Sequence, residues 1–120
     1  MSSAAVSIVI PVWNGREFLA RLLEKLRSQT YPIAEIIAVD NGSSDGAAEA
    51  AEREGARVLR MGSNLGFSRA ANEGIEACNS ELVALVNSDL EPEADWLAQL
   101  VKALDTKDVW FAAGKILIRF

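Results

Sequence analysis

Asn87-Ser88-Asp89 follows an apolar run from Leu82 to Val86 and precedes Leu90-Glu91-Pro92. The apolar run predicts a buried strand, and a carboxylate at the carboxyl end of such a strand lies where open α/β sheets bind their ligands. Oxygen ligands suit a hard cation such as Mg²⁺ or Mn²⁺, and such a cation binds diphosphates. Because Asn and Asp also occur in ordinary turns, the tripeptide alone leaves a purely structural role open.

Three further polar segments follow predicted strands in the same way. Each contains turn signals, so turn formation alone is an alternative for each of them. The carboxyl ends of parallel strands share one edge of a sheet, where the ligand crevice opens, so we expect all four segments to lie together. The three segments are Pro11-Val12-Trp13-Asn14-Gly15, Asp40-Asn41-Gly42-Ser43-Ser44-Asp45-Gly46 and Gly62-Ser63-Asn64-Leu65-Gly66-Phe67.

The residue types in these segments suit a nucleotide. Trp13 offers a flat stacking surface for a base, although it could equally be a core or surface aromatic residue. Asn41 offers both a donor and an acceptor to the Watson–Crick edge of a pyrimidine. Asp40 can accept a hydrogen bond from base or ribose, and Asp89 with a bound cation can neutralise a diphosphate.

Strands and helices are predicted to alternate along the chain, which indicates an α/β fold with a mainly parallel sheet. The strands are nearly continuous apolar runs, as expected when helices cover both faces. Ser68 is a candidate N-cap, Pro92 suits the first position of the last helix, and Gly55 suits a helix C-terminus. We predict strands at 6–10, 35–39, 57–60 and 82–86, helices at 16–29, 47–54, 68–77 and from about 92 to 104, and an apolar, strand-like tail at 109–120.

Composition limits the possible functions. The chain has 120 residues, enough for one domain, and a net charge of −5, which argues against a nucleic-acid partner. It contains no His, which excludes Ser-His-Asp and Cys-His catalysis and histidine metal sites. Cys78 has no base to activate it, so we predict a small packed residue on a helix. A single cysteine forms no internal disulfide, and we expect a cytoplasmic protein.

These segments, in this order and spacing, resemble the family 2 inverting glycosyltransferases over almost the whole chain. The resemblance implies a GT-A-type, Rossmann-like sheet that binds a nucleotide-sugar donor and a divalent metal, Mg²⁺ or Mn²⁺. It further implies transfer to a saccharide or lipid-linked acceptor with inversion. The motifs that carry it are Val6 to Asn14, Ile36 to Gly46, Asn64-Leu65-Gly66-Phe67-Ser68-Arg69-Ala70-Ala71-Asn72-Glu73-Gly74, and Asn87-Ser88-Asp89.

The resemblance assigns roles by position. Asp89 is the implied metal ligand, with Asn87 as a second candidate, because Asn87-Ser88-Asp89 matches the Asp-x-Asp motif of the family. The remaining implied donor-binding residues form the wall behind the base (Pro11, Val12, Trp13 and the adjacent Asn14), the acidic pair that contacts base and ribose (Asp40, Asn41), the loop and helix start near the donor (Asn64, Gly66, Asn72), and Ser88.

Two positions depart from the family pattern. Asn41 replaces the more usual second acid, and Asn87 replaces the first Asp of Asp-x-Asp. Each change removes a negative charge but keeps a carbonyl oxygen, which predicts a weaker hold on the metal or a smaller role for it. Within the family, this combination resembles the rhamnosyltransferases and galactofuranosyltransferases of bacterial cell-wall and polysaccharide biosynthesis, which implies a UDP- or dTDP-linked sugar.

The length of the chain is a third departure. Family members usually have a further half that binds the acceptor and supplies the catalytic base, so we expect residues 1–120 to be the nucleotide-diphospho-sugar-binding part of a larger enzyme. The base is then expected beyond Phe120, since Glu91, Glu93 and Asp95 lie where a helix dipole favours acids regardless of catalysis. Alone, this part is expected to be inactive.

Two expectations concern the surroundings of the full-length protein. It could associate with the inner face of the membrane, and the apolar end of the chain could pair with a second copy, because an exposed strand edge promotes self-association.

Two other functions remain open on the sequence alone. The chain could be a nucleotide-sugar-binding module without catalysis, because it lacks a base. It could also be a flavodoxin-like or response-regulator-like signalling domain, which would explain acidic strand ends. Against the signalling domain, Asp40 has no acidic companion in the expected place and Trp13 has no role.

Overall fold

The computed structural model describes residues 4–104, and its four strands form one parallel sheet in the order β3-β2-β1-β4. Val12 lies beside Asp40, and Asp40 lies beside Arg60, so three strands end at the same level. The predicted α/β class with a parallel sheet is therefore confirmed. The strands are β1 (Val6–Val12), β2 (Glu35–Asp40), β3 (Arg57–Arg60) and β4 (Leu82–Leu85).

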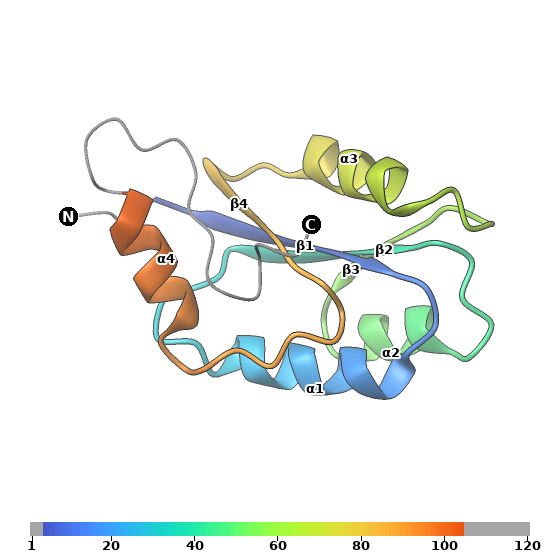
Figure 1. Ribbon diagram of the computed structural model, residues 1–120, viewed down its shortest axis with the longest axis horizontal. Helices are drawn as coiled ribbons and strands as arrows, with labels where there is room; N and C mark the ends of the chain where they lie inside the picture. The colour runs from blue at the N-terminus through green and yellow to red at the C-terminus, as the bar shows by residue number, and fades with distance from the viewer. Residues whose placement is uncertain (1–3, 105–120) are drawn as a thin grey trace.

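Helices cover both faces of the sheet. Figure 1 shows α1 and α2 below it and α3 above it. Side chains alternate along β1, so Ile8 and Ile10 pack with α1, α2 and α4, whereas Val9 packs with Ala70 of α3. This two-sided burial explains why the strands are apolar throughout. The helices are α1 (Arg16–Arg27), α2 (Ala47–Arg53), α3 (Phe67–Ala77) and α4 (Trp96–Leu104).

Gly74 lets α3 approach the sheet closely. A Cβ atom at this position would lie 2.4 Å from Cγ1 of Val9 and 2.9 Å from Cγ2 of Val39. Both distances are far below van der Waals contact, so a larger residue would force the helix away from β1 and β2. The close contact at Gly74 therefore sets the distance between α3 and the sheet.

Helix ends differ from the predictions in four places, three of them in α1, α2 and α3. Helix α1 ends at Arg27 rather than Gln29. Helix α3 begins at Phe67 after Gly66, so Ser68 lies inside the helix and is not its N-cap. Helix α2 ends at Arg53 rather than Glu54. Gly55 does follow α2, with φ 93°, and the amides of Gly55 and Ala56 donate to Glu52 and Ala51, a Schellman C-terminus.

The last helix begins at Trp96, not near Pro92 as predicted. The side chain of Gln29 contacts this segment at two points. Its Nε2 donates to the carbonyl of Glu93 at 2.7 Å, and its Oε1 accepts from the amide of Leu97 at 3.0 Å. The helix is therefore capped by a residue 68 positions earlier in the chain, which local sequence signals do not reveal.

Two further predictions concern the end of α3 and the tail. Cys78 lies just beyond α3 rather than within it, half-buried, with Sγ 3.3 Å from the carbonyl oxygen of Gly74. Burial raises the pKa of its thiol, which fits a packed and unreactive residue. The predicted strand at 109–120 and its pairing with a second copy lie outside the described residues. Within 4–104, no helix is long and apolar enough to cross a bilayer.

Candidate nucleotide-sugar site

The loops after β1 and β2 are interlocked through Asn14. Its backbone amide donates to Oγ of Ser43 at 2.7 Å, and its Oδ1 accepts from the amide of Ser44 at 2.9 Å. Asn14 adopts φ 58°, a left-handed conformation that Asn tolerates better than most residues. The predicted donor-binding residue Asn14 thus uses its side-chain oxygen to hold the two loops together.

Asp45 closes the second of these loops onto two helices. Its Oδ2 accepts from the amide of Arg16 at 2.9 Å, and its Oδ1 accepts from the amide of Ala47 at 3.1 Å. These amides belong to the first residues of α1 and α2, which have no partner within their own helices. A carboxylate is favoured at both helix starts by the helix dipole.

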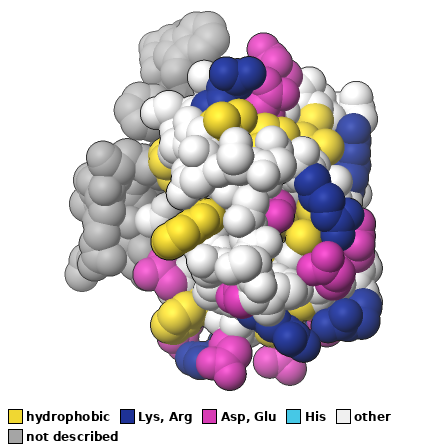
Figure 2. Space-filling model, turned by 90° about the vertical axis from the view of Figure 1, so that its right-hand side faces the viewer, with side chains coloured by type: hydrophobic (Ala, Val, Ile, Leu, Met, Phe, Trp, Pro, Cys, Tyr) yellow, Lys and Arg dark blue, Asp and Glu magenta, His cyan; other side chains and the backbone are white. Residues whose placement is uncertain are grey.

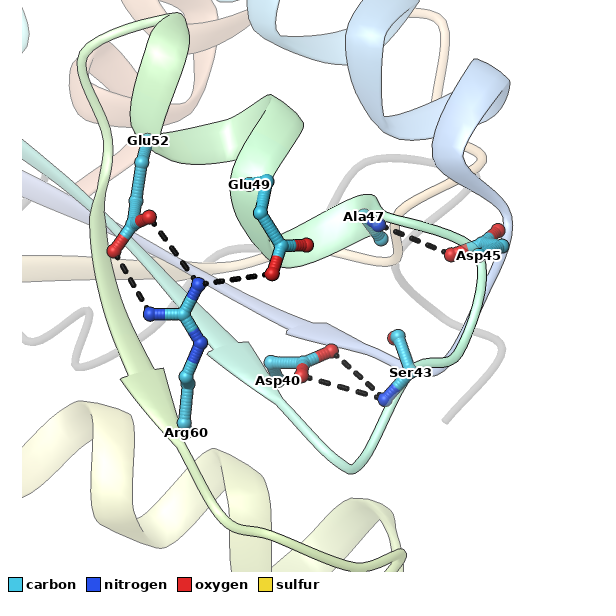
Figure 3. Close-up of polar contacts among 7 residues, drawn as sticks. All are labelled: Asp40, Ser43, Asp45, Ala47, Glu49, Glu52 and Arg60. Atoms are coloured by element: carbon cyan, nitrogen blue, oxygen red, sulfur yellow. Dashed lines mark hydrogen bonds and ion pairs between the residues drawn. The ribbon is translucent and has the colours of Figure 1, made fainter.

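Asp40 lies at the end of β2 and is almost fully buried, with 6% of its surface exposed. Both of its carboxylate oxygens lie within hydrogen-bonding distance of the amide of Ser43, at 3.2 and 3.3 Å (Figure 3). The carboxylate therefore binds the backbone of its own loop, three residues further along the chain. Its predicted contact with base or ribose remains a prediction.

Arg60, opposite Asp40 on β3, is already engaged by acids of α2. Figure 3 shows its guanidinium directed toward Glu52 and Glu49, with nitrogen–oxygen distances of 3.0 and 3.4 Å. The hydrogen bond to Glu52, followed by the charges of Glu52, Glu49 and Asp40, raises the pKa of Arg60. In this structure the guanidinium is paired with α2 at a partly exposed position.

The third loop, which follows β3 and spans residues 61–66, is held to the loop after β2 by Asn41. Its Nδ2 donates to the carbonyl of Gly66 at 3.1 Å, and its Oδ1 accepts from the amide of Leu65 at 3.3 Å. Asn64 forms a turn of its own, with Oδ1 accepting from the amide of Gly66 at 2.9 Å. Gly42 allows the close approach, because a Cβ there would lie 2.9 Å from Cα of Ser63.

Trp13 provides the exposed aromatic surface at this edge. Strand β1 continues through Pro11 and Val12, past the predicted end at Ile10, and both residues are buried. Val12, 2% exposed, belongs to the core beside α1 and α2. Trp13 is 58% exposed, so its ring is the part of the predicted wall that is open to a ligand.

Asn87-Ser88-Asp89 forms a turn after β4, closed by the amide of Leu90 donating to the carbonyl of Asn87 at 3.1 Å. Val86 and Leu90 are buried on either side of it. The amide of Val86 also donates to the carbonyl of Val9 at 3.0 Å, which continues the pairing of β4 with β1. Asp89 is exposed, and Asn87 and Ser88 are half-buried, so the turn is open to solvent at the predicted edge.

The Asn87–Asp89 turn has too few acidic side chains to hold a cation alone, but it suits a cation that a bound diphosphate also coordinates. The described residues hold no group of three or more Cys, Asp or Glu side chains that could bind a metal by themselves. Mg²⁺ characteristically binds through one or two carboxylates together with substrate phosphates and water. The carboxylate of Asp89 and the amide oxygen of Asn87 fit a cation that a diphosphate helps to hold.

The edge of the sheet is polar overall. Figure 2 views the end of the molecule toward which β1 and β2 run in Figure 1. Backbone and uncharged polar atoms dominate this face, and the hydrophobic side chains form separate groups rather than one continuous patch. Such a surface suits a hydrogen-bonding ligand with one stacking contact better than an apolar one.

The structure brings most of the predicted residues to one edge, but not all. Asn72 lies in the second turn of α3, about 8 Å along the helix from Phe67. Glu91 is exposed and lies 4.0 Å from Arg21 of α1. The organising roles of Ser43 and Asp45 were not predicted from the sequence. The signal available for Asp45 was an acid two residues before a helix.

Residues 7–120 match the model of glycosyl transferase family 2, and the chain therefore belongs to this family. This membership confirms the resemblance at the level of the family and sets aside the signalling-domain alternative. The sheet order and the flanking helices are those of a GT-A-like fold.

Three similar proteins illustrate the relationship. Glycosyltransferase AglE of Haloferax volcanii is 32% identical, over 92% of this chain and 39% of that protein. The undecaprenyl-phosphate 4-deoxy-4-formamido-L-arabinose transferase of Edwardsiella ictaluri is 35% identical, over 83% and 34%. The mannosyltransferase PcManGT of Pyrobaculum calidifontis, solved with GDP-Man and Mn²⁺, superposes with a TM-score of 0.84 at 25% identity, over 91% and 34%. The chain thus spans less than two fifths of the length of each of these proteins.

Proposed function

We propose that this chain binds the nucleotide-sugar donor of an inverting glycosyltransferase. The observation that carries the proposal is the convergence of the loops after β1, β2 and β3, tied together by Asn14, Asn41 and Asp45, beside the Asn87–Asp89 turn of β4. Membership in family 2 supports the same conclusion. The base that accepts the proton of the acceptor hydroxyl is expected beyond Phe120.

The donor is proposed to be a UDP- or dTDP-linked sugar, transferred as rhamnose or galactofuranose. The Asp40-Asn41-Gly42-Ser43 and Asn64-Leu65-Gly66-Phe67 motifs support this choice. A saccharide or lipid-linked acceptor is proposed, and the name of the Edwardsiella ictaluri relative supports the lipid-linked one. A cytoplasmic protein that works at the inner face of the membrane would meet both substrates.

Each residue has a proposed task at this edge. The ring of Trp13 stacks on the base, and the carboxylate of Asp40 accepts from base or ribose. Asp89, with Asn87 beside it, would hold a divalent cation together with the diphosphate. When bound, that cation supplies charge stabilisation to the leaving diphosphate.

The test is donor turnover by the full-length protein. UDP-, dTDP- and GDP-sugars are supplied with Mn²⁺, and release of the nucleoside diphosphate is measured with and without oligosaccharide or polyprenyl-phosphate acceptors. Metal-dependent release from a pyrimidine nucleotide sugar supports the proposal. Tight nucleotide binding without any release would instead indicate a binding module without catalysis, and release from GDP-sugars alone would overturn the proposed donor class.

A further inference from the structure

Asn41 is buried, with 4% of its surface exposed, and its amide faces the third loop rather than solvent. One end donates to the carbonyl of Gly66 and the other accepts from the amide of Leu65. Its own backbone amide donates to the carbonyl of Val12 at 2.8 Å, so its main chain is fixed to β1. Asn41 therefore links the end of β1 with the segment that enters α3.

The chemistry of the two contacts requires an amide. The carbonyl of Gly66 needs a donor, and the amide of Leu65 needs an acceptor, on side-chain atoms that share one carbon. An ionised carboxylate of the same size could accept from Leu65 but would meet the Gly66 oxygen with a lone pair. An unpaired, buried charged group is costly. An Asp at position 41 would therefore break the contact with the carbonyl of Gly66.

The surrounding backbone depends on the same contact. Gly66 adopts φ 92° and lies directly before Phe67, the first residue of α3. On the other side of Asn41, Gly42 lies so close to Ser63 that no Cβ would fit. The two loops therefore pack against each other on both sides of the Asn41 amide, and the start of α3 is placed by that packing.

We propose that Asn41 is a positioning residue, whose amide fixes the 64–66 segment and the first turn of α3 at the donor edge. What this segment positions rests on the proposed function, namely the nucleotide sugar. The proposal also explains why Asn41 stands where the resemblance implies a second acid. An amide has no negative charge to offer the ribose, but it can make both hydrogen bonds that hold the third loop. It differs from the earlier expectation that Asn41 reads the base.

A matched pair of substitutions separates this role from a general effect of charge. Asn41→Asp removes a donor that the structure uses, whereas Asn64→Asp keeps the acceptor that serves the amide of Gly66. Hydrogen–deuterium exchange of peptides covering 62–70 is measured without nucleotide, with the 6–12 strand as an internal reference. We expect exchange in Asn41→Asp to be faster by about tenfold or more, and exchange in Asn64→Asp to remain within about twofold of the wild type.

Low pH should restore slow exchange in Asn41→Asp, which would not happen if the substitution only disturbed packing. Once protonated, the carboxyl introduced by Asn41→Asp again carries one donor and one acceptor. The excess exchange should therefore disappear between about pH 8 and pH 5, because burial raises the pKa of an introduced carboxyl. The charged groups on the packed elements are Asp40 and Asp45 on the same loop, Arg57 and Arg60 on β3, and Arg69, Glu73 and Glu76 on α3. Expressing each rate as a ratio to the wild type at the same pH removes their contribution.

The outcomes are distinct. Wild-type exchange in Asn41→Asp at pH 8, equal effects at positions 41 and 64, or an excess that acid does not reduce would overturn the proposal. If Asn41→Asp does not fold, uncharged Asn41→Ser serves in its place and should raise loop exchange by about tenfold while 6–12 stays protected. Failure of the wild type to bind any nucleoside diphosphate would count against the proposed function, and not against this contact.

Discussion

The carboxylate of Asp45 accepts a hydrogen bond from the backbone amide of Arg16, 29 residues earlier in the chain, at 2.9 Å. Its second oxygen accepts from the amide of Ala47 at 3.1 Å. The positions preceding α1 and α2 are Gly15 and Gly46, which have no side chain to cap their helices. One acid therefore serves two helix starts and fixes the loops that carry the proposed donor site.

Replacing Asp45 with Ala should lower the free energy of unfolding by about 1–2 kcal/mol, because two helix N-termini lose their acceptor. Urea denaturation measures the change. Ser44→Ala is the matched control, since the exposed Ser44 takes part through its backbone amide, and it should stay within about 0.5 kcal/mol of the wild type. Equal stabilities for both variants would show that the double cap contributes nothing.

Gly74→Ala should destabilise the fold by about 1–3 kcal/mol through overpacking against Val9 and Val39. This cost should exceed the roughly 1 kcal/mol that Ala gains over Gly within a helix. Urea denaturation measures the change in the free energy of unfolding. When Gly74→Ala is combined with Val9→Ala, the space left by Cγ1 of Val9 should make the destabilisation by Gly74→Ala smaller. An unchanged cost in that background would contradict the close contact between α3 and β1.

Trp13→Ala should weaken nucleotide binding by about 1–3 kcal/mol if the ring stacks on the base, and should leave stability nearly unchanged because Trp13 is 58% exposed. Calorimetric titration measures the affinity. Phe18→Ala removes another exposed ring, 49% accessible, from α1, and should bind as the wild type does. A loss of less than a few tenths of a kcal/mol at Trp13 would return that residue to a structural role.

Acid should destabilise the protein partly through Glu35. Its hydrogen bonds from Ser7 and from the amide of Asn79, together with the charge of Arg57, lower the pKa of this carboxyl from 4.5. A lowered pKa means that Glu35 stabilises the folded state above about pH 4.5, and that this contribution is lost as the pH falls through the folded-state value. Unfolding free energies measured from pH 6 to pH 3 should therefore fall less steeply in Glu35→Gln.

Ser7→Ala removes the largest cause of the lowered pKa and should also flatten that profile, though less completely than Glu35→Gln. If the slopes of wild type and Glu35→Gln coincide, the hydrogen bonds at Glu35 do not contribute to acid sensitivity.

The sequence predicted the fold well, because its signals are local and periodic. Apolar runs such as Ile8 to Ile10 are buried on both sides of the sheet, and the αL position of Gly55 follows α2 as expected. The predicted start of α4 was wrong, and the cap that the structure shows there comes from Gln29, 68 residues before Leu97. Helix ends capped from a distance carry no sign in their own segment.

The candidate site was predictable in place but not in its internal organisation. Strand ends must share one edge in a parallel sheet, and the structure brings the loops after β1, β2 and β3 together there. That this edge binds the nucleotide sugar stays a prediction. That Asn14 and Asn41 meet the donor stays a prediction, and the structure adds that their side chains bind neighbouring loops, which was not predicted. Such pairings depend on loop conformations, which arise from tertiary contact and not from residue spacing.

The most direct test of the donor site is calorimetric titration of the full-length protein with UDP and dTDP, each with and without Mn²⁺, in the wild type, in Asp89→Ala and in Glu91→Ala. Mn²⁺ should tighten binding of one pyrimidine diphosphate by about tenfold or more, roughly 1.4 kcal/mol. Glu91→Ala should keep this gain, because Glu91 is an exposed acid 4.0 Å from Arg21, and Asp89→Ala should lose it. An equal gain in Asp89→Ala, or no nucleotide binding by the wild type, would contradict the site.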